Sequence, residues 1–157
     1  MSEGSRVLVA LRVPAAPERA FAAFTDEIGA WWRPNGLFQF TDRTGTLAFD
    51  PGPGGRLVET YDDGSSFTIG EVLTWEPPTR LVLTWRQASF APDQSTELHV
   101  TFTDVGTETR VVVEHHGWDR IPAEHAARHG FPLAPFQQRF AEWWQDQLAR
   151  LGAVAAD

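Results

Sequence analysis

The feature that most constrains this chain is an aromatic stripe near its C-terminus. Apolar side chains recur there at intervals of three and four residues, the spacing of one face of a helix of roughly 15 to 20 residues. They are Phe136, Phe140, Trp143, Trp144, Leu148 and Leu151. The opposite side is polar, with Gln137, Arg139, Glu142, Gln145, Asp146 and Arg150. A helix this aromatic needs a partner surface, because it cannot hide its apolar face alone.

The partner surface is predicted by the first three quarters of the chain. Residues 7–13 alternate as a strand, Pro14 ends it, and Pro17 suits the first position of a short helix. Thr25 and Asp26 are expected to cap a second short helix. From residue 45 to 116 the period is two, broken by short turns, which predicts five or six strands in an antiparallel meander. The predicted class is α+β, in the order βααβββββα: a curved antiparallel sheet of six to seven strands wrapped around the long C-terminal helix.

Composition narrows the function classes. The 157 residues suit one domain, 1–157, with a core of about 6–151. A net charge of -8, with 13 Arg scattered singly, argues against nucleic acid and anionic membranes as partners. The chain has no Cys, which excludes disulfides, thiolate nucleophiles and Cys-ligated metals. The sequence shows no signal peptide or membrane-spanning run, so cytoplasmic location is the expectation.

Three stretches resemble the START-like helix-grip (SRPBCC) superfamily, in the branch named after the activator of the heat-shock-protein ATPase. The first runs from Glu18 to Trp32 and ends in paired tryptophans, and the second from Gly54 to Trp85 contains Gly-Glu-Val-Leu-Thr-Trp-Glu-Pro-Pro-Thr-Arg-Leu. The third joins the segment from Gly106 to Trp118 to the terminal Trp143-Trp144 helix. The resemblance implies a hydrophobic cavity, as in lipid-transfer proteins, plant hormone receptors and polyketide cyclases.

If that cavity exists, the inward face of the sheet and the aromatic residues of the helices line it. The expected lining is Trp31, Trp32, Phe38, Val58, Thr60, Phe67, Ile69, Glu71, Leu83, Trp85, Val100, Phe102, Val113, His115, Trp118, Phe136, Phe140, Trp143 and Trp144. The alternative is a fully packed core, since aromatic rings fill space as readily as they line it. Trp118 is expected near the mouth.

Glu71 and His115 are the polar exceptions on these apolar faces, and a buried polar group needs a partner or a shifted pKa. Both are candidates for catalysis or for contact with a ligand. The register around Glu71 is ambiguous, because Val72 can instead take the inward position and turn Glu71 to solvent.

No metal site is expected. His125 and His129 have the four-residue spacing of two ligands on one helical turn, but a third ligand is out of reach because neighbouring His115 and His116 point to opposite sheet faces. The Gly-Pro-Gly-Gly turn at 52–55 precedes no helix that would bind phosphate, and no Ser has a nucleophile-elbow setting.

The sequence therefore favours a binding module for a small, largely apolar molecule, lipid-like or aromatic, with no cofactor. A polyketide cyclase or aromatase using the same cavity is the alternative, with a Glu or His moving a proton. A third hypothesis is a co-chaperone of a heat-shock-protein ATPase, which the branch name suggests but its usual members seldom require. A homodimer is left open.

Overall fold

The computed structural model describes residues 6–34 and 38–156, and they form a seven-stranded antiparallel sheet with helices on one side. The strands lie in the order β1-β7-β6-β5-β4-β3-β2. Their bounds are β1 Arg6–Val13, β2 Thr46–Phe49, β3 Arg56–Thr60, β4 Ser66–Glu76, β5 Arg80–Trp85, β6 Thr96–Asp104 and β7 Thr109–His116. The first strand pairs antiparallel with the last, so β1 and β2 form the two edges of the sheet.

Two short helices follow β1. The helix α1 (Pro17–Thr25) begins with the expected proline in its first turn. The helix α2 (Ile28–Trp31) is not capped by Thr25 or Asp26 as predicted, since its N-cap is Glu27. The Thr25 hydroxyl instead donates to the Phe21 carbonyl at 2.8 Å. Two 3₁₀ turns, η1 (Trp118–Arg120) and η2 (Ala126–Arg128), follow the last strand.

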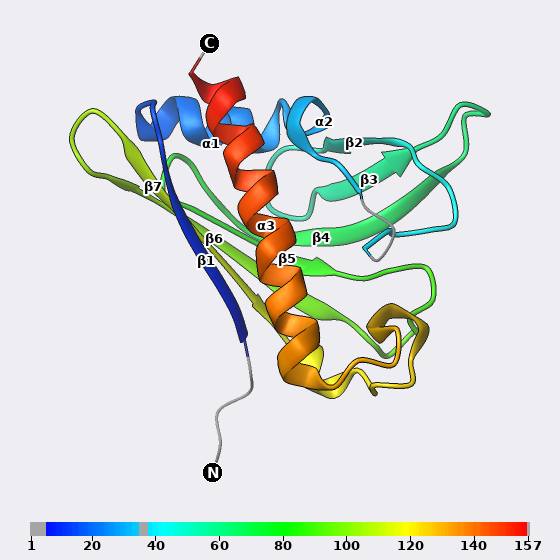
Figure 1. The fold of residues 1–157 in the computed structure, drawn as a ribbon. Coiled ribbons are helices and arrows are strands. Elements are labelled where there is room, and N and C mark those ends of the chain that lie inside the picture. The colour runs from blue at the N-terminus through cyan, green and yellow to red at the C-terminus, as the bar shows by residue number, and fades with distance from the viewer. Residues whose placement is uncertain (1–5, 35–37, 157) are drawn as a thin grey trace.

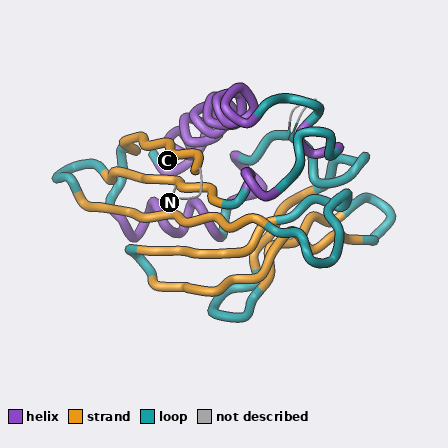
Figure 2. Tube along the Cα trace, turned by 90° about the horizontal axis from the view of Figure 1, so that it is seen from below, coloured by secondary structure: helices purple, strands orange, loops and turns teal. Residues whose placement is uncertain are grey.

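The C-terminal helix α3 (Leu133–Ala155) has 23 residues, slightly longer than predicted. It lies diagonally across the sheet, with α1 and α2 beside its C-terminal half (Figure 1). Seen from below, the sheet curves toward the side on which the helices lie (Figure 2). Phe140, Trp144, Leu148 and Leu151 are fully or almost fully buried. The predicted helix-grip architecture is confirmed.

The buried face of β4 does not follow a simple alternation. Phe67 and Ile69 point inward, but the next inward residue is Val72, so Glu71 is exposed. The shift occurs at Gly70, where an added Cβ would lie 1.7 Å from the Thr84 carbonyl oxygen of β5. Only glycine permits this approach of the two strands, and the bulge changes the register by one residue.

The expected register of β3 is wrong. Leu57 and Glu59 are buried, whereas Val58 is half-buried and Thr60 is exposed. The inward carboxylate of Glu59 is compatible with burial because it accepts a hydrogen bond from the Tyr61 hydroxyl at 2.7 Å and one from the Gly45 amide at 3.3 Å.

No helix among the described residues combines the length and apolar character needed to cross a membrane.

Candidate functional site

Aromatic rings from the sheet, α2, α3 and the loop after β7 meet between the sheet and α3. We call this set the aromatic layer. It comprises Trp32, Phe40, Trp85, Trp118, Phe136, Phe140, Trp143 and Trp144. Trp32 is at its centre, with ring centroids 5.5 Å from Trp85, 5.0 Å from Trp143 and 5.4 Å from Trp144. These separations are those of favourable aromatic pairs, so the layer is cohesive as well as apolar.

Each of the two tryptophan pairs, Trp31-Trp32 and Trp143-Trp144, contains one indole whose nitrogen donates to a backbone carbonyl and one whose nitrogen does not. The Trp31 indole donates to the Ala23 carbonyl at 2.9 Å, and the Trp143 indole donates to the Arg33 carbonyl at 3.0 Å. Within the described part of the chain, the buried Nε1 atoms of Trp32, Trp118 and Trp144 have no hydrogen-bond partner. An unpaired buried donor costs about 1–3 kcal/mol. Three of them in one layer are expensive for a purely structural core.

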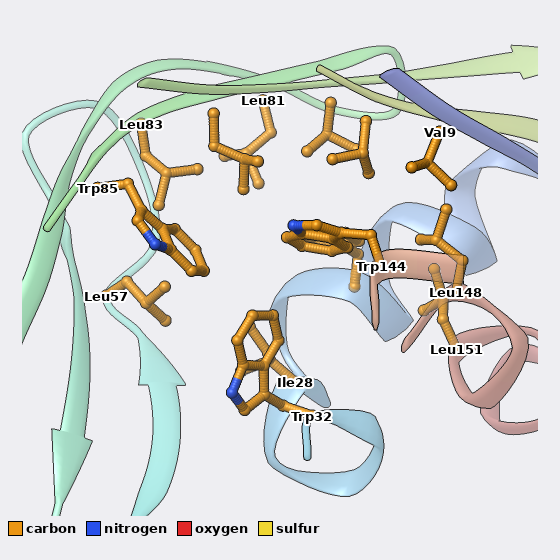
Figure 3. Close-up of a cluster of buried hydrophobic side chains, with 14 of the residues drawn as sticks. Val9, Ile28, Trp32, Leu57, Leu81, Leu83, Trp85, Trp144, Leu148 and Leu151 are labelled. Atoms are coloured by element: carbon orange, nitrogen blue, oxygen red, sulfur yellow. The ribbon is translucent and has the colours of Figure 1, made fainter. Parts of the chain in front are cut away.

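Figure 3 shows how two of these indoles lie. Trp144 comes from α3 and lies below the side chains of the sheet, with its nitrogen edge turned toward Trp85. Trp32 comes from the end of α2 and approaches the same space from the other side, near Leu57 and Ile28. The two indoles therefore come from different elements and meet in one region between the sheet and the helices.

His115 adds a polar group at the same layer. Its ring is completely buried, and its centroid lies 5.4 Å from that of Trp85, 5.3 Å from Trp118 and 5.0 Å from Phe140. Burial lowers the pKa of His115 well below its usual 6.5, and His116 and His99 lower it further. The ring is therefore neutral at ordinary pH. Its Nε2 lies 2.6 Å from the Thr96 hydroxyl, while Nδ1 has no partner among the described residues.

The segment that follows α2 is attached to α3 by a polar seam. The buried Gln147 side chain accepts from the Arg33 amide at 3.0 Å and donates to the Arg33 carbonyl at 2.8 Å. Arg150 donates to the Trp31 carbonyl at 3.0 Å. The seam holds Trp32 over the sheet without using its indole nitrogen.

The structure brings most of the predicted lining residues together. Buried in the core are Trp31, Trp32, Phe38, Ile69, Leu83, Trp85, Val100, Phe102, Val113, His115, Trp118, Phe136, Phe140, Trp143 and Trp144. Val58 and Phe67 are only half-buried, and Thr60 and Glu71 are exposed. Glu71 is therefore not part of the interior, because the bulge at Gly70 turns it outward. Trp118, expected near a mouth, is fully buried against Phe136 and Phe140.

Sequence reasoning missed two buried charged residues. Glu59 was overlooked because Val58 looked like the inward residue of its strand. Arg128 is buried and donates to the carbonyls of Ile121 at 2.6 Å and Phe131 at 2.7 Å, which fixes the loop before α3. No spacing signal marks an Arg in an irregular loop, so only the fold reveals its role.

The histidines of this loop are not arranged as two ligands on a helical turn. The helical residues between them are those of the short 3₁₀ turn Ala126–Arg128, and His129 has a left-handed φ of 53°. Both ring nitrogens of His125 are engaged, Nδ1 by the Ala127 amide at 3.0 Å and Nε2 by the Ser89 carbonyl at 3.1 Å. Among the residues that the structure describes, no group of three or more His, Asp or Glu is placed to hold a metal ion.

A surface groove of about 380 Å³ lies away from the aromatic layer, between α1 and the turn after β4. Phe21 and Trp75, edge to face at 5.3 Å, form part of its wall. Glu18 and Asp26 lie at its exposed rim. Any binding experiment must separate this groove from the interior.

The family described as Activator of Hsp90 ATPase homolog 1-like protein matches residues 14–156 of this chain. None of the curated protein sequences matches the chain significantly.

Several solved structures are similar over nearly the whole chain. An anthrahydroquino-γ-pyrone synthase, Txn09, is 30% identical, with 98% of this chain and 99% of that chain covered and a TM-score of 0.58. A protein from Mesorhizobium loti is 23% identical, with 96% of each chain covered and a TM-score of 0.64. An Hsp90 activator from Plasmodium falciparum is 22% identical, with 96% of each chain covered and a TM-score of 0.63. The last two likenesses concern the fold alone.

Proposed function

This chain belongs to the family of Activator of Hsp90 ATPase homolog 1-like proteins, and from that premise we propose that it binds a small, largely apolar aromatic molecule between the sheet and α3. The observation that carries the proposal is the set of unpartnered polar atoms in the aromatic layer. Trp32, Trp118 and Trp144 offer donors there and His115 offers a ring nitrogen, all of them buried. Ligand sites combine such an apolar lining with a few convergent polar groups.

The similar synthase supports an aromatic ligand over an aliphatic one. Its name describes an enzyme that makes a fused aromatic pyrone, and the likeness extends along both chains. The rings of the aromatic layer can stack on a planar molecule, whereas the alkyl tail of a fatty acid offers no acceptor to indole donors spread along the layer. Binding therefore requires the layer to open, with the ligand's rings and oxygen atoms replacing contacts that the side chains make with one another.

The second candidate is an enzyme of the cyclase or aromatase type acting on the same molecule. His115 is its candidate proton acceptor, because Nδ1 has no partner among the described residues, although the burial that lowers its pKa also weakens it as a base. This candidate shares the binding site with the first, and turnover of the bound molecule distinguishes the two.

The location of the site is tested by calorimetric titration with 1,8-dihydroxyanthraquinone as the probe. Leu83→Trp adds a ring on the buried face of β5, and Ala22→Trp adds one at the surface groove. We expect wild type and Ala22→Trp to bind with a dissociation constant in the micromolar range, roughly -8 kcal/mol. Leu83→Trp should lose binding at least tenfold while remaining folded by circular dichroism.

The opposite pattern, with binding lost in Ala22→Trp and kept in Leu83→Trp, would place the probe in the groove and refute an interior site. Absorption spectra of the probe during incubation report turnover, which would favour the enzyme over the binding module.

A further inference from the structure

The hydrogen bonds around Thr96 determine which nitrogen of His115 carries the proton. The Thr96 hydroxyl lies 3.1 Å from the Trp85 carbonyl oxygen and 2.6 Å from His115 Nε2. The Thr96 hydroxyl donates its single proton to the Trp85 carbonyl, which can only accept. In this arrangement His115 Nε2 is the donor to the Thr96 oxygen. The neutral ring then has its proton on Nε2 and a free lone pair on Nδ1.

The lone pair of His115 Nδ1 is a buried hydrogen-bond acceptor, and no described group donates to it. His115 and Thr96 are almost completely buried, and Nδ1 has no partner in the described part of the chain. Three aromatic rings surround the imidazole, those of Trp85, Trp118 and Phe140. None of them is hydrogen-bonded to Nδ1, so the acceptor is left for a group that enters the layer.

The unpartnered indole nitrogens of the aromatic layer are hydrogen-bond donors, whereas His115 Nδ1 is an acceptor. Trp118, whose Nε1 is also unpartnered, has its ring centroid 5.3 Å from that of His115. Trp144 and Trp32 carry unpartnered donors farther along the layer, 6.2 Å and 5.5 Å from Trp85 by ring centroid. The layer therefore offers one acceptor beside several donors. A planar molecule with one hydroxyl and with carbonyl oxygens would satisfy both kinds of group.

We propose that His115 Nδ1 accepts a hydrogen bond from a phenolic or enolic hydroxyl of the bound aromatic molecule, and that Thr96 is the positioning residue that fixes the required tautomer. This assignment rests on the proposed binding function and names the class of its ligand. The Trp118 indole, whose ring lies beside that of His115, then donates to a carbonyl oxygen of the same molecule.

The matched probes are 1-naphthol and 1-methoxynaphthalene, which share the ring system but differ in the hydroxyl proton. We expect wild type to bind 1-naphthol about tenfold more tightly, the effect of one good buried hydrogen bond. His115→Phe keeps a ring between its neighbours but removes the acceptor, so the preference should vanish while 1-methoxynaphthalene still binds. Thr96→Val should reduce the preference, and Thr96→Ser should restore it.

A measurement on the wild-type protein alone guards against variants that fail to fold. Nitrogen-15 spectra of the histidine rings should show His115 protonated at Nε2 and not at Nδ1. A proton on Nδ1 overturns the assignment. If both naphthalenes bind wild type equally, the binding function stands and the role of His115 fails. If neither binds, both proposals fail.

Discussion

At the scale of single residues, His115 connects the chemistry of the site to the stability of the fold. Its folded-state pKa lies well below 6.5, first because of burial and then because of His116 and His99. As the pH falls through about 6.5, the ring of the unfolded chain takes up a proton while the folded ring stays neutral. The unfolded state then binds more protons, so acidification favours unfolding. The stability that the neutral ring gives is present above that pH and is lost below it.

We therefore predict that the free energy of unfolding of wild type falls faster than that of His115→Phe between pH 7.5 and pH 5. One proton limits the difference in slope to about 1.4 kcal/mol per pH unit. Urea unfolding curves at four or five pH values measure it, and the variant controls for every other titrating group. Parallel curves for the two proteins would mean that His115 titrates normally in the folded state.

At the scale of elements, the sequence predicted best where the period was long and regular. The stripe from Phe136 to Leu151 determines α3, and alternation along β5, β6 and β7 predicts which of their residues are buried. Prediction failed where a strand departs from period two. On β3 the apolar Val58 was chosen over Glu59, whose burial depends on a hydrogen bond from Tyr61 that no pattern reveals.

The bulge in β4 had a signal, the isolated Gly70 inside a strand pattern, and it left two registers open. The loop from 117 to 132 had none, because its conformation is held by Arg128 and backbone carbonyls instead of a periodic apolar face. The burial of most residues of the candidate site was therefore predictable. Its unpaired donors and the tautomer of His115 depend on atomic geometry that no spacing encodes.

Two glycines test the element-scale argument. Gly70→Ala should destabilise the protein by roughly 3 kcal/mol, because its Cβ would collide with the Thr84 carbonyl and force β4 away from β5. Gly152→Ala on α3 should stabilise by about 0.5–1 kcal/mol, since its Cβ would meet Val13 Cγ1 at an ordinary 3.7 Å and alanine favours the helix. Thermal and urea unfolding of both variants measure this. Equal changes in the free energy of unfolding for the two variants would contradict the close approach of β4 and β5 at Gly70.

At the scale of the whole molecule, the proposed site would make the ligand-free protein less stable than a protein that buries the same apolar surface without unpaired hydrogen-bond donors. Trp31 and Trp144 have the same exposure, 0%, and each packs among aromatic rings of the core. They differ in that Trp31 Nε1 donates to Ala23 and Trp144 Nε1 is unpaired. A protein selected for stability alone would gain from replacing the second indole, whereas one selected to bind would keep it.

Replacing each by Phe removes the same volume, but only the replacement of Trp31 also removes a hydrogen bond. Without ligand, Trp31→Phe should therefore lose more stability than Trp144→Phe, by about 1–2 kcal/mol in urea unfolding, because only Trp31→Phe breaks a hydrogen bond and leaves a carbonyl without its donor.

With 1,8-dihydroxyanthraquinone present at a hundred times its dissociation constant, wild type should gain about 2.7 kcal/mol. Trp31→Phe should keep most of that gain and Trp144→Phe should lose much of it. Equal losses without ligand would show that the Trp144 nitrogen is already satisfied. An equal gain in both variants would exclude that nitrogen from binding, so the stability gap between the two variants must narrow on adding the probe if the unpaired donors exist for a ligand.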